Sequence, residues 1–131
     1  TVQLATLIKK IDNWKDIFNE NRPKVIVDKQ SYAIYFSRAP IPYFFHLKKE
    51  QWPDQHTFYK HIGMYGYRKD TLKEITNLHP SSLEKTESLE QLRWIENGFK
   101  IRTAETKFES WSIDTPEDLD EVLKKFDDQR I

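Results

Sequence analysis

Residues 59–93, YKHIGMYGYRKDTLKEITNLHPSSLEKTESLEQLR, contain the clearest succession of structural elements in this chain. Residues 61–67 alternate in hydrophobicity and include Gly63 and Gly66, which predicts a strand that another backbone or a ligand approaches closely. Residues 69–76 predict a short helix directly after it. This succession of strand and helix is typical of a layered fold that combines a sheet with helices.

A second helix follows in the same stretch, and both of its ends carry recognisable signals. Ser81 and Glu84 form the S-x-x-E pattern of a capping box, in which side chain and backbone satisfy each other at a helix start. Apolar residues then continue to Asn97, and Gly98 provides a C-terminal stop. We therefore predict one helix that runs from the capping box to Asn97.

The N-terminal part of the chain predicts a helix and two strands. Apolar residues at 4, 7, 8, 11, 14, 17 and 18 fall on one helical face, so residues 3–19 predict an amphipathic helix. The short apolar runs 24–27 (KVIV) and 33–36 (AIYF) predict two strands around a polar turn. Residues 37–55 contain three prolines and no regular period, which predicts a long irregular connection.

The C-terminal part adds a strand and a helix. Residues 100–107 predict a strand, and Thr115 followed by Pro116 predicts the start of a last helix through Phe126. Together these elements predict an α/β fold, a mixed sheet with flanking helices. A chain of 131 residues is expected to form a single domain, residues 1–131.

Composition narrows the classes of partner. The 21 basic and 21 acidic residues balance, which argues against binding to nucleic acid. No apolar run approaches the ~18 residues that cross a bilayer, so we expect no membrane contact. The chain has no cysteine, which excludes disulfides and thiolate metal sites and fits a cytoplasmic location. The spacing of the four histidines is not that of a zinc site.

Arg38 is the first candidate for a ligand-binding residue. It follows a predicted strand and precedes two prolines in SRAPIP, residues 37–42, which hold the chain extended. An arginine on such a stiff loop can bind a carboxylate or phosphate through two parallel hydrogen bonds. The structural alternative is an arginine that pairs with a carboxylate or carbonyl of the protein itself.

Four further residues could bind a polar ligand. His61 and Tyr65 lie four apart in a predicted strand, so both side chains emerge on one face, where they could read hydroxyl groups. Glu90 and Gln91 place a carboxylate and an amide side by side in the predicted helix. The alternatives are a partly buried histidine and aromatic, and two ordinary helix-forming residues that face solvent.

Asp114 is the candidate metal ligand. It directly precedes the N-terminus of the last predicted helix. Mg²⁺ prefers one or two carboxylates together with phosphate oxygens and water. The alternative is a carboxylate that interacts favourably with the helix dipole.

Four segments occur together in an order and spacing typical of one enzyme family. These are YFSRAPIPY at 35–43, KHIGMYGYR at 60–68, SSLEKTESLEQLRWIENGFKI at 81–101 and IDTPEDL at 113–119. On these segments the chain resembles the CMP-KDO synthetases, over roughly residues 21–123. The resemblance implies the three-layer, Rossmann-like fold of nucleotide-diphospho-sugar transferases, of which this chain would be the C-terminal portion.

The resemblance also implies an activity and a site. CMP-KDO synthetases transfer CMP from CTP to the anomeric hydroxyl of the acid sugar KDO (3-deoxy-manno-octulosonate) and release pyrophosphate, in lipopolysaccharide biosynthesis. By this similarity the KDO pocket would contain five residues, and Asp114 would be one of two aspartates that hold Mg²⁺. None of them would act as a nucleophile. The five are Arg38, His61, Tyr65, Glu90 and Gln91.

Two features of the family do not occur in the sequence. The glycine-rich CTP-binding loop of the type LxGxGSxRLPxK and the second aspartate are both absent. The resemblance therefore leads us to expect little or no activity from this chain alone, because transfer requires both reactants in line. The alternative is a non-catalytic acid-sugar-binding or dimerisation module. The family's enzymes are typically homodimers, and the aromatic residues 43–45 and Trp52 could serve self-association.

Overall fold

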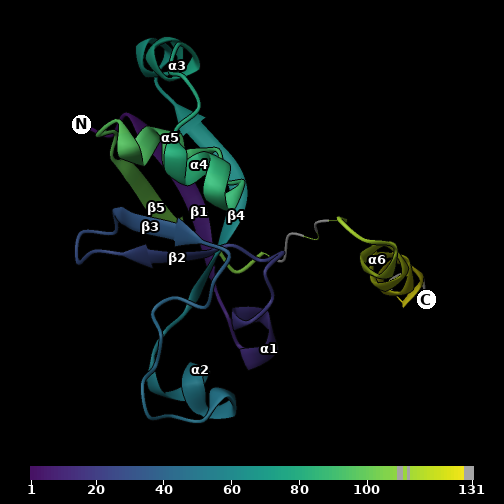
Figure 1. Ribbon diagram of the computed structural model, residues 1–131. Helices are drawn as coiled ribbons and strands as arrows, with labels where there is room; N and C mark the ends of the chain where they lie inside the picture. The colour runs from purple at the N-terminus through teal and green to yellow at the C-terminus, as the bar shows by residue number, and fades with distance from the viewer. Residues whose placement is uncertain (109–110, 112, 129–131) are drawn as a thin grey trace.

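A mixed five-stranded sheet forms the centre of the molecule, with the strand order β3-β2-β4-β1-β5 (Figure 1). The computed structural model describes residues 1–108, 111 and 113–128. Strand β1 pairs in parallel with β5, whereas the pairs β1–β4, β2–β4 and β2–β3 are antiparallel. The strands are β1 (Leu4–Lys10), β2 (Lys24–Val27), β3 (Ala33–Ser37), β4 (Tyr59–Tyr67) and β5 (Ile101–Glu105).

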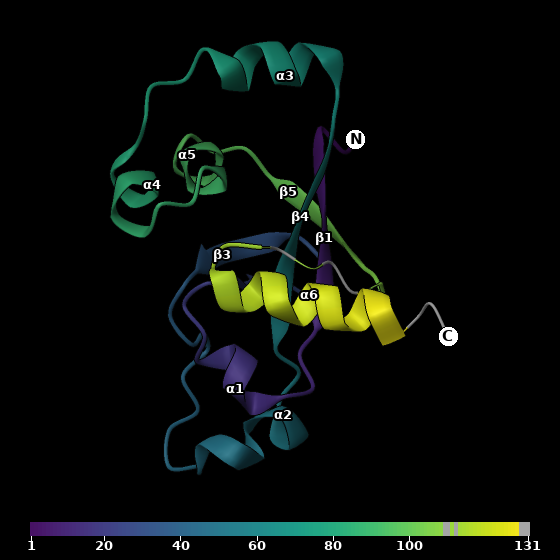
Figure 2. The same ribbon diagram turned by 90° about the vertical axis from the view of Figure 1, so that its right-hand side faces the viewer.

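Helices flank the sheet on several sides (Figures 1 and 2). Helices α4 and α5 lie against one face, α3 lies beyond one end of the long strands, and α1 and α2 lie at the other end. Helix α6 stands away from the sheet, and none of its side chains is buried. No helix in the described part of the chain is long and apolar enough to cross a bilayer. The helices are α1 (Trp14–Ile17), the 3₁₀ turn η1 (Lys49–Gln51), α2 (Trp52–Gln55), α3 (Lys69–Thr76), α4 (Ser82–Glu87), α5 (Gln91–Glu96) and α6 (Pro116–Asp128).

The predicted helix over residues 3–19 is wrong. Its first half is strand β1, between β4 and β5, and only Trp14–Ile17 are helical. Burial along β1 alternates, with Leu4, Thr6 and Ile8 on the buried side. A strand of this kind should show apolar residues at every second position, but its middle buried residue, Thr6, is polar. Leu7, which lies on the opposite face, then gives the apolar spacing 4, 7, 8, 11 that is typical of a helix.

The predicted continuous helix to Asn97 is also wrong, although its capping box at Ser81 is present. The chain forms two short helices, α4 and α5, because Ser88 takes a left-handed backbone conformation with φ of 54°. A left-handed residue ends a helix. The break turns α5 so that Gln91, Leu92 and Trp94 are buried against the sheet.

The other predicted elements are confirmed with small changes in their bounds. Strands β2, β3, β4 and β5 and helices α3 and α6 occur where the sequence predicts them. The connection 37–55 is irregular as expected, apart from the short helical turns η1 and α2 near its end. The predicted mixed sheet with flanking helices is thus the observed architecture.

Two hydrophobic clusters stabilise the fold. The larger lies between the sheet and helices α4 and α5 and includes Leu4, Phe36 and Leu92, each fully buried. The smaller lies at the α1–α2 end around Trp52, which is 1% exposed. Trp52 stacks on Phe58 at 5.7 Å between ring centroids, and its indole N–H donates to a backbone carbonyl. This second cluster anchors the long connection 37–55.

Strand β4 contains a bulge that shapes the middle of the sheet. Thr6 pairs with Tyr65, whereas the next residue, Leu7, pairs with Ile62. Gly63 and Met64 therefore face no residue of β1. Bulges bend a strand and re-aim its side chains, and they are enriched next to active sites. The bulge lies at the residues that the sequence singles out as a possible binding strand.

Replacing Trp52 with alanine tests the role of the second cluster. We expect Trp52→Ala to lower the free energy of unfolding by about 3–5 kcal/mol, because it leaves a large cavity in packed surroundings. Urea denaturation would measure the change. Phe108→Ala is the control, since Phe108 is 86% exposed, and it should change stability by less than about 0.5 kcal/mol. A loss for Trp52→Ala as small as that of the control would contradict the prediction.

Candidate functional site

A cavity of about 340 Å³ opens beside β4, close to the bulge. Of the six residues predicted from sequence, its lining includes Arg38, His61 and Asp114, which lie far apart in the chain, and does not include the other three, Tyr65, Glu90 and Gln91. Its lining is unusually rich in cationic groups. The lining residues are Asn21, Arg22, Pro23, Arg38, Lys60, His61, Ile62, Gly63 and Asp114.

The charges around this cavity favour an anion. Arg22, Arg38 and Lys60 contribute positive charge, and among the residues that the structure describes Asp114 is the single carboxylate in the lining. A cavity with one sign of charge in excess concentrates ligands of the opposite sign. The chain as a whole has zero net charge, so this preference comes from local arrangement and not from composition.

Arg38 is held in place by the protein and still has donors to spare. Its Nε–H donates to the carbonyl of Glu87 at 2.7 Å, and its two terminal nitrogens donate to those of Glu20 at 3.0 Å and Ser88 at 3.1 Å. A guanidinium carries five N–H donors, and within the described part of the chain the other two have no partner. Arg38 therefore binds carbonyl groups of the protein itself, as the alternative interpretation predicted, and still has two N–H groups that can bind a ligand.

The backbone of the Arg38 loop is fixed from both sides. Lys24 is fully buried, and its ammonium donates to the carbonyls of Arg38 at 2.7 Å and Asn19 at 2.8 Å. The Glu87 carboxylate accepts from the Ser37 hydroxyl at 2.7 Å and from the Arg38 backbone N–H at 3.3 Å. These bonds define a clamp, formed by Lys24 and Glu87, that orients the loop.

The charge of Lys24 persists despite burial. Burial and the nearby Arg38 cation lower the pKa of Lys24 to about 8, against the opposing effect of Glu87, Asp16 and Glu20. Lys24 is therefore mostly protonated at neutral pH. Its chain neighbour Pro23 lines the cavity, so the positive charge of Lys24 lies close to it.

His61 is partly buried, and both nitrogens of its ring lie near polar groups. Its Nε2 lies 2.8 Å from the Thr6 hydroxyl, and its Nδ1 lies 3.5 Å from the Gln91 amide nitrogen. Phe36 meets the ring edge-on, with 4.9 Å between centroids. Burial lowers the pKa of His61 to about 4, so the imidazole is neutral at pH 7 and works as a hydrogen-bonding group.

Tyr65 continues the polar strand next to His61. Four residues of regular strand span roughly 13 Å, but the two ring centroids are 5.3 Å apart because the bulge shortens β4. Burial, with smaller effects from Tyr67 and Glu90, raises the pKa of Tyr65. The phenol therefore keeps its proton and can donate a hydrogen bond. Glu90 is exposed near these tyrosines.

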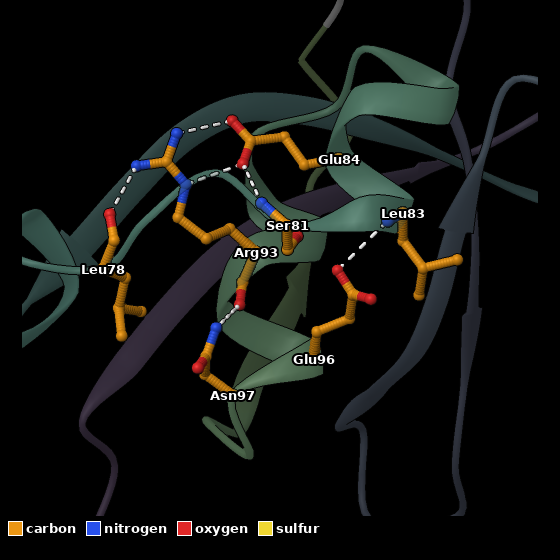
Figure 3. A network of polar contacts seen from close by, with 7 residues as sticks. All are labelled: Leu78, Ser81, Leu83, Glu84, Arg93, Glu96 and Asn97. Carbon is orange, nitrogen blue, oxygen red and sulfur yellow. Dashed lines mark hydrogen bonds and ion pairs between the residues drawn. The ribbon is translucent and has the colours of Figure 1, made fainter.

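A polar network fixes the helix pair that carries Glu90 and Gln91 (Figure 3). The Arg93 guanidinium forms a two-point ion pair with Glu84, at 2.6 and 2.7 Å, and donates to the Leu78 carbonyl at 3.2 Å. Glu84 also accepts from the Ser81 backbone N–H at 3.2 Å. The planar fork of arginine makes such an arrangement directional, so α5 is held in register with α4.

Asp114 lies at the turn that begins α6. The turn is closed by Asp118, whose carboxylate accepts from the backbone N–H groups of Asp114 and Thr115, both at 3.1 Å. The Thr115 hydroxyl in turn accepts from the Asp118 N–H, as predicted for a helix cap. Asp118 therefore caps the turn, and Asp114 is the residue of the turn that lines the cavity.

The described residues do not make a metal site by themselves. Across residues 1–108, 111 and 113–128, no three histidine, aspartate or glutamate side chains gather as a metal-binding group. Asp114 offers one carboxylate beside several cations, which repel Mg²⁺. A metal ion there would need ligands from a bound phosphate or from another segment.

Several residues at the site were missed by the sequence. Thr6 was assigned to a helix, and Arg22, Lys24 and Lys60 were not singled out. Lys24 carries the one usable signal, since it is the charged first residue of the otherwise apolar strand KVIV. Such a residue is seldom fully buried without a partner.

Comparison with known proteins places this chain in a family. Residues 1–108 match a family model described as Cytidylyltransferase. The chain belongs to the cytidylyltransferase family. Within this family it is 59% identical over 119 residues to the 3-deoxy-manno-octulosonate cytidylyltransferase of Cytophaga hutchinsonii, a match covering 90% of this chain and 48% of that protein.

Further cytidylyltransferases agree with this match. The Bacteroides thetaiotaomicron protein of the same name is 50% identical, over 95% of this chain and 52% of that protein. A solved structure of CMP:2-keto-3-deoxy-manno-octonic acid synthetase complexed with CTP superposes with a TM-score of 0.83 at 34% identity, covering 98% of this chain and 51% of that one. The expected resemblance and fold are confirmed, and the chain spans about half the length of these relatives.

Acid should destabilise this cytidylyltransferase fold through His61. The unfolded histidine binds a proton near pH 6.5, whereas the folded one does so near pH 4. The unfolded state therefore holds more protons between these values, and stability falls as pH falls through this window, by roughly 3 kcal/mol at most. Urea denaturation at several pH values would measure the fall. His61→Gln should flatten it, and the exposed His79→Gln should not; equal curves for both variants would contradict the prediction.

Removing the Lys24 ammonium should open the clamp. In Lys24→Met the carbonyls of Asn19 and Arg38 lose their donor in a buried place, so we expect a loss of about 2 kcal/mol in unfolding free energy. The exposed Lys29→Met serves as the control. Thermal and urea denaturation would measure both. A Lys24→Met protein as stable as the control would show that the buried bonds do not stabilise the loop.

Proposed function

We propose that this chain forms the acid-sugar side of a 3-deoxy-manno-octulosonate cytidylyltransferase, which transfers CMP from CTP to KDO and releases pyrophosphate. The observation that carries the proposal is the cavity in which Arg22, Arg38 and Lys60 surround a space beside His61. Its charge suits an acid sugar, and its neutral polar groups suit hydroxyls. The relatives of this name, matched over about half their length, support the same substrate class.

Each predicted residue has a role that its surroundings permit. Arg38, with two unused N–H donors and a clamped backbone, binds the sugar carboxylate. Neutral His61 and Gln91 exchange hydrogen bonds with sugar hydroxyls. Tyr65, whose ring lies beside His61, donates a further bond, and exposed Glu90 near Tyr65 accepts one. These groups position the sugar, and none acts as a nucleophile.

Mg²⁺ and CTP enter this proposal through Asp114. Mg²⁺ held between one carboxylate and phosphate oxygens would neutralise charge that develops at the α-phosphate. Asp114 supplies that one carboxylate, and the nucleotide supplies the phosphates. The solved relative in complex with CTP supports a nucleotide partner. A cytoplasmic location belongs to the same proposal.

A dimerisation role is the second candidate. Tyr43 is 67% exposed and Phe45 74% exposed, and both follow the Arg38 loop, whereas Trp52, expected on the same surface, is 1% exposed because it packs in the second hydrophobic cluster. Exposed aromatic groups close together are typical of contact surfaces. We propose that they favour a homodimer. The molar mass in solution, from light scattering after size-exclusion chromatography, checks this independently of sugar binding.

Calorimetric titration of the chain with KDO tests the acid-sugar site. We expect Arg38→Met to weaken binding at least tenfold, because it removes a charge-assisted hydrogen bond worth about 1.5–3 kcal/mol. Arg38→Lys keeps the positive charge but loses the planar guanidinium, so its affinity for KDO should lie between those of the parent chain and Arg38→Met. Lys29→Met should bind as the parent does.

Pyrophosphate release extends the test to catalysis. The chain would be assayed with CTP, KDO and Mg²⁺, alone and mixed with the remaining half of a related enzyme. We expect Glu90→Ala to weaken the active combination. A folded dimer that binds no KDO and releases no pyrophosphate in either setting would overturn the enzymatic proposal in favour of a dimerisation module.

A further inference from the structure

The Thr6 hydroxyl lies within hydrogen-bonding distance of three polar atoms, although it has a single proton to donate. Its Oγ1 lies 2.9 Å from the carbonyl oxygen of Met64, 3.3 Å from that of Ile62 and 2.8 Å from Nε2 of His61. A hydroxyl has a single proton to donate, and a carbonyl can only accept. The contacts to Met64 and Ile62 are therefore favourable only if Thr6 donates to a carbonyl.

This direction decides the state of the histidine. If the Thr6 proton points to the Met64 carbonyl, Nε2 of His61 must be the donor across the 2.8 Å contact. The opposite arrangement would set the oxygen lone pairs of Thr6 against two carbonyls in a buried place. In a neutral imidazole one nitrogen donates and the other accepts. Nδ1 is then a bare acceptor.

The other side of the ring agrees with this assignment. Nδ1 of His61 faces the Gln91 amide nitrogen, which is a donor, at 3.5 Å. This contact is long for a hydrogen bond, so a hydroxyl of a ligand could replace it at small cost. Gln91 is 5% exposed and lies at the start of α5. A relay thus runs from Gln91 through His61 and Thr6 to the Met64 carbonyl.

The bulge of β4 makes this relay possible. Since Gly63 and Met64 face no residue of β1, the Met64 carbonyl lies within reach of the Thr6 side chain. Thr6 and His61 come from neighbouring central strands, and Gly63 lines the cavity at the same point. The bulge, the threonine and the histidine therefore act as one unit.

We propose that Thr6 is a positioning residue that fixes His61 in the tautomer protonated at Nε2, so that Nδ1 accepts a hydrogen bond from a hydroxyl of the bound sugar. In this hydrogen bond the ligand is the donor and His61 is the acceptor, so the histidine favours a ligand that presents a hydroxyl group at this point. The ligand part rests on the proposed function. The tautomer part follows from contacts within the protein and stands independently of it.

Long-range ¹H–¹⁵N NMR of the histidine side chains at pH 7 tests the tautomer directly. We expect His61 of the parent chain to carry its proton on Nε2. Thr6→Ser, which keeps the hydroxyl, should preserve this state, and Thr6→Val, of nearly the same shape, should lose it. A parent His61 protonated on Nδ1, or a Thr6→Val spectrum equal to that of the parent, would overturn the proposal.

Titration with KDO tests the ligand part. Thr6→Val should bind KDO about tenfold more weakly, a difference of about 1.4 kcal/mol, and Thr6→Ser should stay within about twofold of the parent. Unchanged affinity in a folded Thr6→Val chain would overturn the role in recognition. If the parent itself binds no KDO while the NMR result is as expected, the proposed function fails and the tautomer assignment survives.

Discussion

The pairing of β1 with β4 is the interaction on which the rest of the structure depends. Strand β1 is a central strand, paired with β4 on one side and β5 on the other. Both partners are distant in the chain, so the sheet exists only when the whole fold has closed. The bulge in this pairing then brings His61 against Thr6 and Tyr65, which a regular ladder would not do. One irregularity in the ladder thus builds one side of the site.

Buried and partly buried charged residues fix the loop and the helices around the cavity. Lys24 is fully buried and Glu87 partly so, and their bonds hold the backbone and side chain of Arg38. Breaking a buried polar pair costs far more than the pair contributes to stability, so these groups define a single loop geometry. Arg93 and Glu84 do the same for α4 and α5. Rigid loops and helices around the cavity let its few polar groups act at fixed positions.

This arrangement is consistent with binding chemistry more than with bond-making chemistry. His61 is a neutral imidazole and Tyr65 an intact phenol, so both are suited to hydrogen bonding. Arg22, Arg38 and Lys60 line the same cavity as His61, together with Asp114. Under the proposed function the acceptor sugar must be held in line with a nucleotide, and fixed neutral and cationic groups are what such positioning requires.

The sequence by itself determined the mixed α/β architecture, most of the strands and helices, the caps at Ser81 and Thr115, and the family. These follow from local patterns, since period, punctuation and capping depend on neighbours a few residues away. It failed at β1, because a buried threonine disguises a central strand, and at Ser88, where packing of α5 outweighs a continuous helical pattern. Only the tertiary structure decided that Arg38, His61 and Asp114 share a cavity and that Lys24 and Thr6 orient two of them. Those relations join residues from separate strands and helices, and the register that creates them is set by long-range pairing that no local pattern encodes.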